Sequence, residues 1–261
     1  MLVGLLVVAG WMLAALAAPQ LAAYAPLAQN LHDRLQEPSL SHPFGTDELG
    51  RDILSRVLYG GRITIPAGLV VVVVGSTIGS LVGAVAGYVG GVWDELLMRV
   101  TELFMAFPSI ILAMAVSAAL GPDIKNAIIA LVVVWWPSYA RLMRGLVLEV
   151  KTKEYVEATR SIGASAAYIL GRVIIPNSLG PIVVLTTLDI GNAILSIAGL
   201  SFLGLGPEPS SPEWGRMVAV SIDFFDQWWM WLFPGLAIAS LVIAFNFVGD
   251  GLRDITDPRL C

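Results

Sequence analysis

The sequence predicts an all-α integral membrane protein with six transmembrane helices. Of its 261 residues, 57% are hydrophobic and only 13% are charged, and the mean hydropathy is +0.79, far from the averages of soluble domains. Six long runs are almost free of charge, and a bilayer core of ~30 Å needs about 20 apolar residues in a helix. These runs lie within residues 1–28, 62–94, 102–123, 125–141, 173–207 and 226–250.

Two interpretations of the first run stay open. Residues 14–18 are mostly small and Pro19 follows them, which is typical of a secretory segment with a cleavage site. No Lys or Arg precedes the run, however, and such a basic start is normally part of a signal peptide. We therefore expect a retained first helix over residues 1–18. Under either interpretation, the segment that follows lies on the external side of the membrane.

Residues 19–62 form a long polar segment, which we expect to be an external loop. From Asp47 onward apolar residues recur at helical spacing, while Glu48, Arg51, Asp52 and Arg56 fill the opposite face. This pattern predicts an amphipathic helix lying in the membrane interface. It is either a docking surface or a connector that delivers the chain to the second span.

The second run contains a regular pattern of small residues. Five glycines recur at every fourth position: Gly75, Gly79, Gly83, Gly87 and Gly91. Glycines on one helix face let two backbones approach closely, which is how helices gain association energy in lipid. The pattern predicts a buried, tightly packed helix, and packing is favoured over a flexible gate.

The third and fourth runs are separated from their neighbours by polar residues. We expect Asp94 to Glu102 to form a short turn before the third helix. The fourth run holds Trp135, Trp136 and Pro137 near its middle. Arg144, close after this run, is expected to reach the headgroups.

A charged insert follows over residues 150–176. Glu154 to Ile162 suits a helix, Gly163 tolerates a tight turn, and Ala164 to Arg172 suits a second helix that Pro176 limits. The insert reads E-A-T-x-x-x-G, nine residues, then V-I-I-P. It resembles the EAA loop of ABC-importer permeases, written E-A-A-x-x-x-G with nine residues before I-x-L-P.

The resemblance to this loop implies a coupling helix that receives mechanical work from a soluble ATPase. Thr159 stands where the pattern has Ala, and Val173 and Ile175 replace Ile and Leu with residues of similar size. The residues expected to carry the coupling are Glu154, Glu157, Ala158, Thr159, Gly163, Val173, Ile175 and Pro176.

Three further stretches resemble one branch of these permeases, the peptide/nickel permeases of the DppC/OppC type. They are HPFGTDELGRDILSR before the second run, SFLGLG with SPEWG after the fifth, and GDGLRDITDPRL at the end. The resemblance implies the type I ABC importer permease fold, a homologous permease partner in a heterodimer, two cytoplasmic ABC ATPases and an external solute-binding protein. Such subunits usually begin with a basic tail, and this chain does not, so its true N-terminus is left open.

The chain itself carries no nucleotide-binding signature. The pattern G-x-x-x-x-G-K-[ST] is absent, so we expect no bound cofactor and no ATPase activity, with ATP and Mg²⁺ used by the partner subunits. The single cysteine, Cys261, is the last residue, which excludes an internal disulfide and a cysteine-based metal site. We expect no catalytic residues and no nucleic-acid partner, only the bilayer and the importer subunits.

The sidedness of Lys and Arg sets the expected orientation in the inner membrane. If the insert is cytoplasmic, alternation places nine basic residues inside and six outside, as the positive-inside tendency requires. The expected organisation is one domain over residues 1–261. Residues 63–250 then form a five-helix core with the cytoplasmic EAA loop 150–176, and residues 251–261 form a cytoplasmic tail.

The fifth run offers candidates for a solute path. Asp189 is its only charge, and an ionisable residue inside a span is costly and normally faces the bundle interior or water. Two interpretations stay open, because Asp189 either lines the path or hydrogen-bonds a neighbouring helix. The polar residues expected along the path are Thr186, Asp189, Asn192 and Ser196 on one helix face, with Asn246 in the sixth run.

The resemblance to these permeases implies a subunit that imports solutes by alternating access. Di- and oligopeptides are the expected solutes, with nickel or a metal chelate as the alternative. A secondary transporter and an intramembrane enzyme are distant alternatives. No H-E-x-x-H or G-x-S-x-G pattern occurs, and no second carboxylate accompanies Asp189 within the spans.

Overall fold

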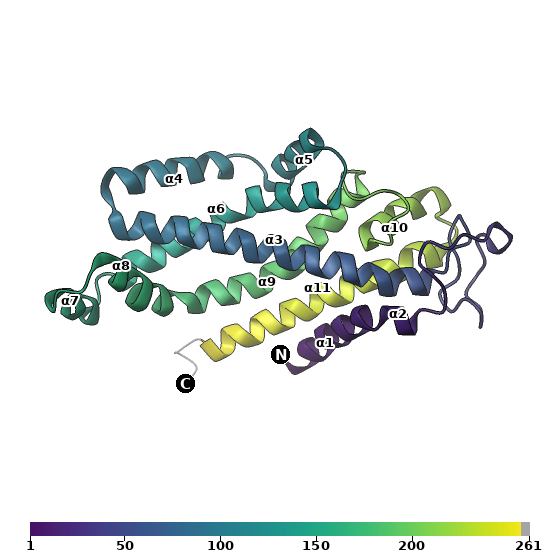
Figure 1. Cartoon of the computed structure of the whole chain (residues 1–261), viewed down its shortest axis with the longest axis horizontal. Coiled ribbons are helices and arrows are strands. Elements are labelled where there is room, and N and C mark those ends of the chain that lie inside the picture. The colour runs from purple at the N-terminus through teal and green to yellow at the C-terminus, as the bar shows by residue number, and fades with distance from the viewer. Residues whose placement is uncertain (257–261) are drawn as a thin grey trace.

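The computed structural model describes residues 1–256, which form an elongated bundle of helices (Figure 1). The helices are α1 (Leu2–Leu16), α2 (Ala18–Leu21), η1 (Leu31–Asp33), α3 (Ile53–Val89), α4 (Gly91–Met105), α5 (Ser109–Leu120), α6 (Ile124–Val150), α7 (Glu154–Ser161), α8 (Ala166–Tyr168), η2 (Ile169–Ile174), α9 (Ile175–Phe202), α10 (Trp214–Val220), η3 (Ser221–Phe224) and α11 (Trp228–Thr256). Helices α7 and α8 lie at one end of the bundle, the α7 end, and residues 22–52 lie at the other, the loop end (Figure 1). The expected tail 251–261, with Cys261, lies partly outside the described residues.

All six apolar runs fall in helices, but their lengths differ. Within residues 1–256, four helices are long and apolar enough to cross a membrane: α3, α6, the continuous helix over 166–202 and α11. Helices α4 and α5 qualify as one further span only if taken together, and they are bent by 86°. Helix α1 is apolar but shorter, and it packs along α11, where the indole N–H of Trp11 donates to the Ser240 hydroxyl at 2.9 Å.

The start of α3 differs from the expected interfacial helix. Residues 47–52 are a loop, and the helix that begins at Ile53 continues without a break to Val89. The Asp52 carboxylate caps this helix by accepting from the Ser55 backbone N–H at 2.8 Å. Arg51 and Arg56 are buried rather than facing solvent. The helical spacing in the sequence therefore belongs to the first turns of a membrane-spanning helix.

The polar stretch from Asp94 to Glu102 is helical rather than a short turn. It lies inside α4, and the chain bends only afterwards, between Met105 and Ser109. Asp94 pairs with Arg144 of α6 through two contacts of 2.6 and 2.7 Å, so its charge is satisfied on the helix surface. Because the Asp94 carboxylate is paired with Arg144 on a neighbouring helix, this charge does not destabilise the helical conformation.

Four of the five glycines in the small-residue pattern lie against α6. A Cβ added at Gly79 or Gly83 would overlap the carbonyl oxygen of Trp136 or Ala140, respectively. A Cβ at Gly75 would lie 3.1 Å from the Cβ of Trp135, and one at Gly87 would lie 3.0 Å from the carbonyl oxygen of Arg144. At Gly79 and Gly83 the two backbones thus meet closely enough that any side chain would separate them, and at Gly75 and Gly87 a Cβ would fit only tightly.

Gly91 differs from the other four. Helix α3 ends at Val89, and Gly90 and Gly91 both have positive φ, of 71° and 60°. A Cβ at Gly91 would meet nothing within 4 Å. Gly91 therefore provides the left-handed backbone of the sharp turn from α3 into α4. It takes no part in the contact with α6.

We expect Gly83→Ala to destabilise the protein by up to about 2 kcal/mol. Alanine improves helix propensity by ~1 kcal/mol, but its methyl group overlaps the backbone of α6 at Ala140, and overpacking costs typically 1–3 kcal/mol. Thermal unfolding in detergent measures the change. Gly145→Ala is the matched control, because a Cβ there meets nothing within 4 Å. Equal stability of the two variants would contradict the close packing.

Candidate functional site

Helix α7 and Gly163 form a small unit at the α7 end of the bundle (Figure 1). The backbone N–H of Ile162 donates to Ala158 at 3.2 Å, and that of Gly163 donates to Arg160 at 3.0 Å. Gly163 has φ +84°, a left-handed conformation that residues with a Cβ adopt at a cost. The turn after α7 therefore depends on glycine for its backbone shape, and no neighbouring atom of the described chain lies within 4 Å of the position of a Cβ.

Helix α7 is held by one side and exposes the rest. Val156 is fully buried and anchors the helix to the bundle. Glu154, Glu157 and Ala158 are exposed and Thr159 is half-buried, with its hydroxyl donating to its own helix. Among residues 1–256, neither Glu154 nor Glu157 belongs to an ion pair. The exposed surface joins these carboxylates to the apolar side chain of Ile162, which is 84% exposed.

The helix after Gly163 does not end at Pro176. Short helix α8 runs into the wide π-helical turns of η2 and then into α9, so residues 166–202 form one continuous helix. Pro176 lies in the first turn of α9, directly after these turns. A wide turn accommodates a residue without an N–H, which explains why proline does not break the helix here. Val173 and Ile175 are half-buried against the core.

Asp189 lies where α9 faces α6. Its Oδ2 accepts the indole N–H of Trp135 at 3.1 Å and the hydroxyl of Tyr139 at 2.9 Å. Its Oδ1 accepts from the Asn192 side chain, one turn along α9, at 3.3 Å. Of the two interpretations of Asp189, the structure thus shows the contact with a neighbouring helix. The sequence shows Trp135 and Tyr139 at i, i+4 spacing on α6 but does not indicate that they meet this carboxylate.

The other residues expected along the path differ in whether their polar groups are hydrogen-bonded within their own helix or exposed. The hydroxyls of Thr186 and Ser196 donate to carbonyls of their own helix, at 2.7 and 2.8 Å. Asn192 and Asn246 have exposed side chains. Ser/Thr groups that bond to their own helix are tolerated in apolar surroundings, whereas an exposed amide within a span calls for a polar or protein neighbour.

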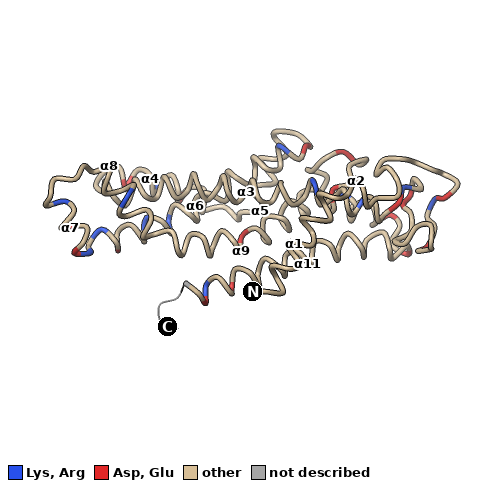
Figure 2. Tube along the Cα trace, turned by 60° about the horizontal axis from the view of Figure 1, so that its bottom comes forward, with Lys and Arg blue, Asp and Glu red and all other residues tan. Residues whose placement is uncertain are grey.

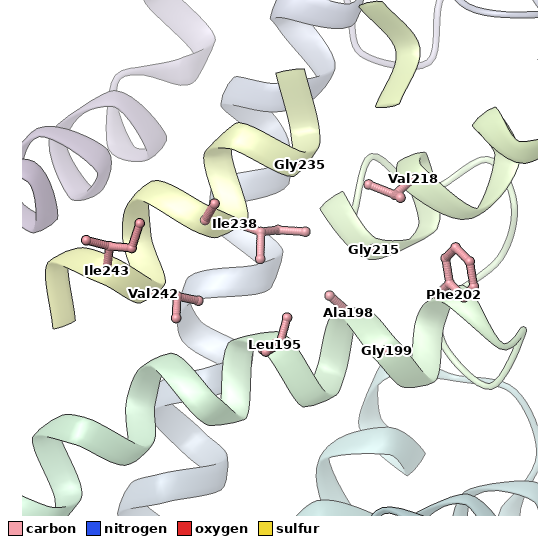
Figure 3. A pocket seen from close by; sticks show the side chains of 11 residues that line it. Leu195, Ala198, Gly199, Phe202, Gly215, Val218, Gly235, Ile238, Val242 and Ile243 are labelled. Atoms are coloured by element: carbon pink, nitrogen blue, oxygen red, sulfur yellow. The ribbon is translucent and has the colours of Figure 1, made fainter. Parts of the chain in front are cut away.

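Among the grooves on the described part of the bundle, two differ in the chemistry of their lining. One, of 380 Å³, lies between α3, α6 and α9 and contains Thr186 together with the hydroxyl residues Ser76, Thr77, Ser80 and Thr187. The other, of 620 Å³, lies between α9, α10 and α11 and is lined without any polar side chain, for example by Leu195, Phe202 and Ile238 (Figure 3). Of these two grooves, the first offers hydrogen-bonding groups that are able to orient a polar solute.

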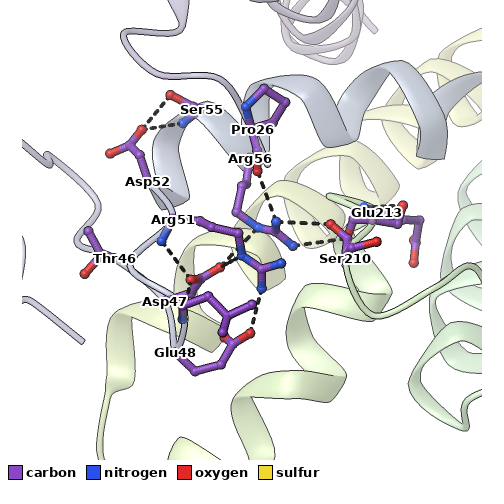
Figure 4. Close-up of polar contacts among 12 residues, drawn as sticks. Pro26, Thr46, Asp47, Glu48, Arg51, Asp52, Ser55, Arg56, Ser210 and Glu213 are labelled. Atoms are coloured by element: carbon purple, nitrogen blue, oxygen red, sulfur yellow. Dashed lines mark hydrogen bonds and ion pairs between the residues drawn. The ribbon is translucent and has the colours of Figure 1, made fainter. Parts of the chain in front are cut away.

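The loop end is organised around two buried arginines (Figure 4). Arg51 contacts Asp47 and Glu48, both at 2.6 Å, and Arg56 contacts Asp47 at 3.4 Å. Arg56 also donates to the backbone carbonyls of Pro26 at 3.1 Å and of Ser210 at 3.2 Å. Segments far apart in the sequence are thus joined at one guanidinium group. In the sequence, the i, i+4 spacing of Asp47 and Arg51 indicates an ion pair here. The predicted interfacial helix placed these charges in solvent and did not predict a buried network.

A second buried carboxylate lies beside this network. Glu213 caps α10 by accepting from the backbone N–H groups of Gly215 and Arg216 at 2.9 and 2.8 Å. Burial raises the pKa of Glu213 above its usual value, although the two N–H groups act in the opposite direction. Its Oε1 also accepts from the hydroxyl of Thr64 in α3 at 3.4 Å, which links the start of α10 to α3.

Charged residues gather toward the two ends of the bundle, and the helices between carry few (Figure 2). Arg51 and Arg56 at the loop end are buried and paired with Asp47 and Glu48, whereas Lys153 at the α7 end is exposed and pairs with Glu149 at 3.5 Å. Burial therefore removes two basic residues from the exposed surface of the loop end. Among residues 1–256, no group of three or more His, Cys, Asp or Glu side chains is arranged to hold a metal ion.

The chain resembles permeases over most of its length. It is 45% identical over 242 residues to the probable D,D-dipeptide transport system permease protein DdpC of Escherichia coli K12, covering 92% of this chain and 81% of that protein. It is 42% identical over 261 residues to the dipeptide transport system permease protein DppC of Alkalihalophilus pseudofirmus, covering 99% and 86%. The glutathione transport system permease protein GsiD of Escherichia coli O6:K15:H31 is 50% identical over 224 residues, covering 85% and 74%.

The fold is that of the type I ABC importer permeases. It matches the inward-facing MetNI methionine ABC transporter with a TM-score of 0.63 and 20% identity, over 78% of this chain and 96% of that one. The family described as "Binding-protein-dependent transport system inner membrane component" matches residues 79–260, well over half of the chain. The chain therefore belongs to the family of inner membrane components of binding-protein-dependent transport systems.

Proposed function

We propose that this chain is the membrane-spanning permease subunit of an ATP-driven, binding-protein-dependent importer of short peptides. The observation that carries the proposal is α7, a short helix joined to two membrane helices with its carboxylates and apolar side chains exposed. Exposed apolar groups beside charges, outside the membrane spans, are typical of a protein interface. The curated relatives are transport permeases, and this chain is a transport subunit rather than an enzyme.

The exposed face of α7 is the proposed contact with the ATPases. Glu157 supplies a polar contact, Ile162 an apolar one, and Gly163 the turn that presents them. We place the α7 end in the cytoplasm because accessible positive charge favours that side. Two cytoplasmic ABC ATPases then bind ATP and Mg²⁺, and the loop end faces the external solute-binding protein. This chain binds no cofactor itself.

Short peptides are the proposed solutes because of the relatives. The names of three of them specify D,D-dipeptide, dipeptide and glutathione, and all three are short peptides. Identity of 42–50% to these permeases supports the same class of solute.

A second, homologous permease completes the proposed path. Asn192 and Asn246 have exposed amides in membrane helices, and such groups normally face protein or a water-filled cavity. A partner permease facing α9 and α11 encloses them together with Ser196 and Thr186. Asp189 supports this path from the side of α6, toward which its carboxylate is turned.

Reconstitution tests the proposal. The proteoliposomes contain this chain, its partner permease and both ATPases. They are expected to accumulate radiolabelled dipeptide only when ATP is inside the vesicles and binding protein is outside. Omission of either is expected to reduce uptake to background. Uptake driven by an ion gradient, without ATP and binding protein, would contradict the proposal.

A further inference from the structure

Helices α6 and α9 are the two membrane helices that flank the α7 segment. Helix α6 ends at Val150, immediately before this segment, and the continuous helix of α8, η2 and α9 begins at Ala166. Through the chain itself, a displacement of α7 thus reaches the bundle by these two helices, besides the packing of Val156. Whether they respond together depends on what joins them within the membrane.

A polar contact joins them at Asp189. Its carboxylate accepts from Trp135 and Tyr139, which lie one turn apart on the same face of α6. Both donors come from one helix and the acceptor from the other, so the contact resists sliding as well as separation. Asn192 bonds the second carboxylate oxygen at 3.3 Å and so orients the group.

Helix α3 holds the donors in place. The Cβ of Trp135 lies against Gly75, and the Cβ of Tyr139 lies against Gly79. Tyr139 is fully buried, so its ring has little freedom to turn away from Asp189. The glycine face of α3 therefore helps to position Trp135 and Tyr139 for their hydrogen bonds to Asp189, although α3 itself makes no hydrogen bond there.

The wide turns of η2 lie between α7 and the contact. Residues 169–174 are π-helical, and such turns are often found at functional sites. From Tyr139 to Val150 is 11 residues, or ~16 Å of helix α6. The contact thus lies well inside the bundle, beyond the wide turns.

We propose that Asp189 is a positioning residue that ties α6 to α9, so that the two helices flanking α7 move as one unit during transport. The proposal rests on the function proposed above. Loss of the tie lets α7 move without a full response of the bundle, so ATP is hydrolysed without import. The carboxylate acts through α6 and does not contact the solute.

The number of ATP molecules hydrolysed per peptide imported tests the tie in the reconstituted complex. Helix–helix hydrogen bonds in membranes correspond on average to about a threefold change in an equilibrium. We expect Tyr139→Phe to raise the ratio about threefold and Asp189→Leu to raise it about tenfold, because both helix–helix bonds, from Trp135 and Tyr139, are lost. Asp189→Asn keeps an acceptor oxygen and is expected to stay close to wild type.

Thr101→Val is the matched control, because the buried Thr101 hydroxyl donates to the carbonyl of Leu97 in its own helix, at 2.8 Å. If Asp189→Leu does not assemble, the Trp135→Phe, Tyr139→Phe double variant carries the test with an aromatic ring retained at both positions. An unchanged ratio in that variant, or a loss of import in Asp189→Asn as severe as in Asp189→Leu, would overturn the tie. Absence of ATP-driven uptake by the wild-type complex would instead contradict the proposed function.

Discussion

Arg56→Met is expected to destabilise the protein by about 3–5 kcal/mol, the cost of removing one partner from a buried ion pair. Arg56 is 2% exposed, and its guanidinium group bonds the carbonyls of Pro26, Ser210 and Ser211 at 3.1–3.2 Å. Methionine fills a similar volume but leaves these carbonyls and Asp47 without this partner. Thermal unfolding in detergent measures the stability, and limited proteolysis reports whether residues 22–52 come loose.

The control for this variant lies two turns further along the same helix. Arg62 is exposed, and its guanidinium carbon lies 5.8 Å from the centre of the Tyr59 ring. Arg62→Met is expected to change the stability by less than about 1 kcal/mol. Arg56→Lys should be intermediate, since an ammonium group keeps the charge but not the planar geometry that reaches several carbonyls. Equal stability of Arg56→Met and Arg62→Met would show that the loop end does not depend on this network.

Gly163→Pro is expected to reduce import about a hundredfold while the assembled complex still hydrolyses ATP. Proline fixes φ near −65°, whereas Gly163 has +84°, and it removes the N–H that donates to Arg160 at 3.0 Å. A misplaced proline costs about 3 kcal/mol or more, and that amount in the transport step corresponds to about two powers of ten in rate. Peptide uptake and ATP hydrolysis, measured on the same proteoliposomes, give both quantities.

Gly163→Asn separates backbone shape from side-chain contacts. Asparagine adopts positive φ more readily than other residues with a Cβ, and the site has room for it. This variant is expected to retain most of the import. Normal uptake by Gly163→Pro would contradict the role of the turn, and an equal loss in Gly163→Asn would point to crowding by a partner subunit instead.

Local patterns explain which parts of the fold were predictable. The apolar runs predicted the membrane helices, because span length follows from bilayer thickness alone. The glycines from Gly75 to Gly87 could be placed on one helix face, because residues four positions apart lie one above the other on a helix. The composition of the insert likewise predicted a helix that contains Glu157 and a turn at Gly163, and the structure has both.

Features that depend on distant residues were not predictable in the same way. The period of four continued to Gly91, yet that residue lies beyond the end of α3 and serves a turn. Asp94 to Glu102 looked like a turn, but Arg144, 50 residues away from Asp94, satisfies the charge and keeps the segment helical. Pro176 looked like a helix end, but the wide turns of η2 accommodate it.

The sequence by itself determined the membrane class, the positions of the apolar helices and the segment that resembles a coupling loop, because each depends on composition or short spacing. Only the tertiary structure decided what the buried charges contact. Asp189 meets Trp135 and Tyr139, and Arg56 meets carbonyls more than 150 residues away at Ser210 and Ser211. Such partners are chosen by how helices pack, since a charge buried in a membrane protein is stable only where the folded chain brings donors or acceptors to it.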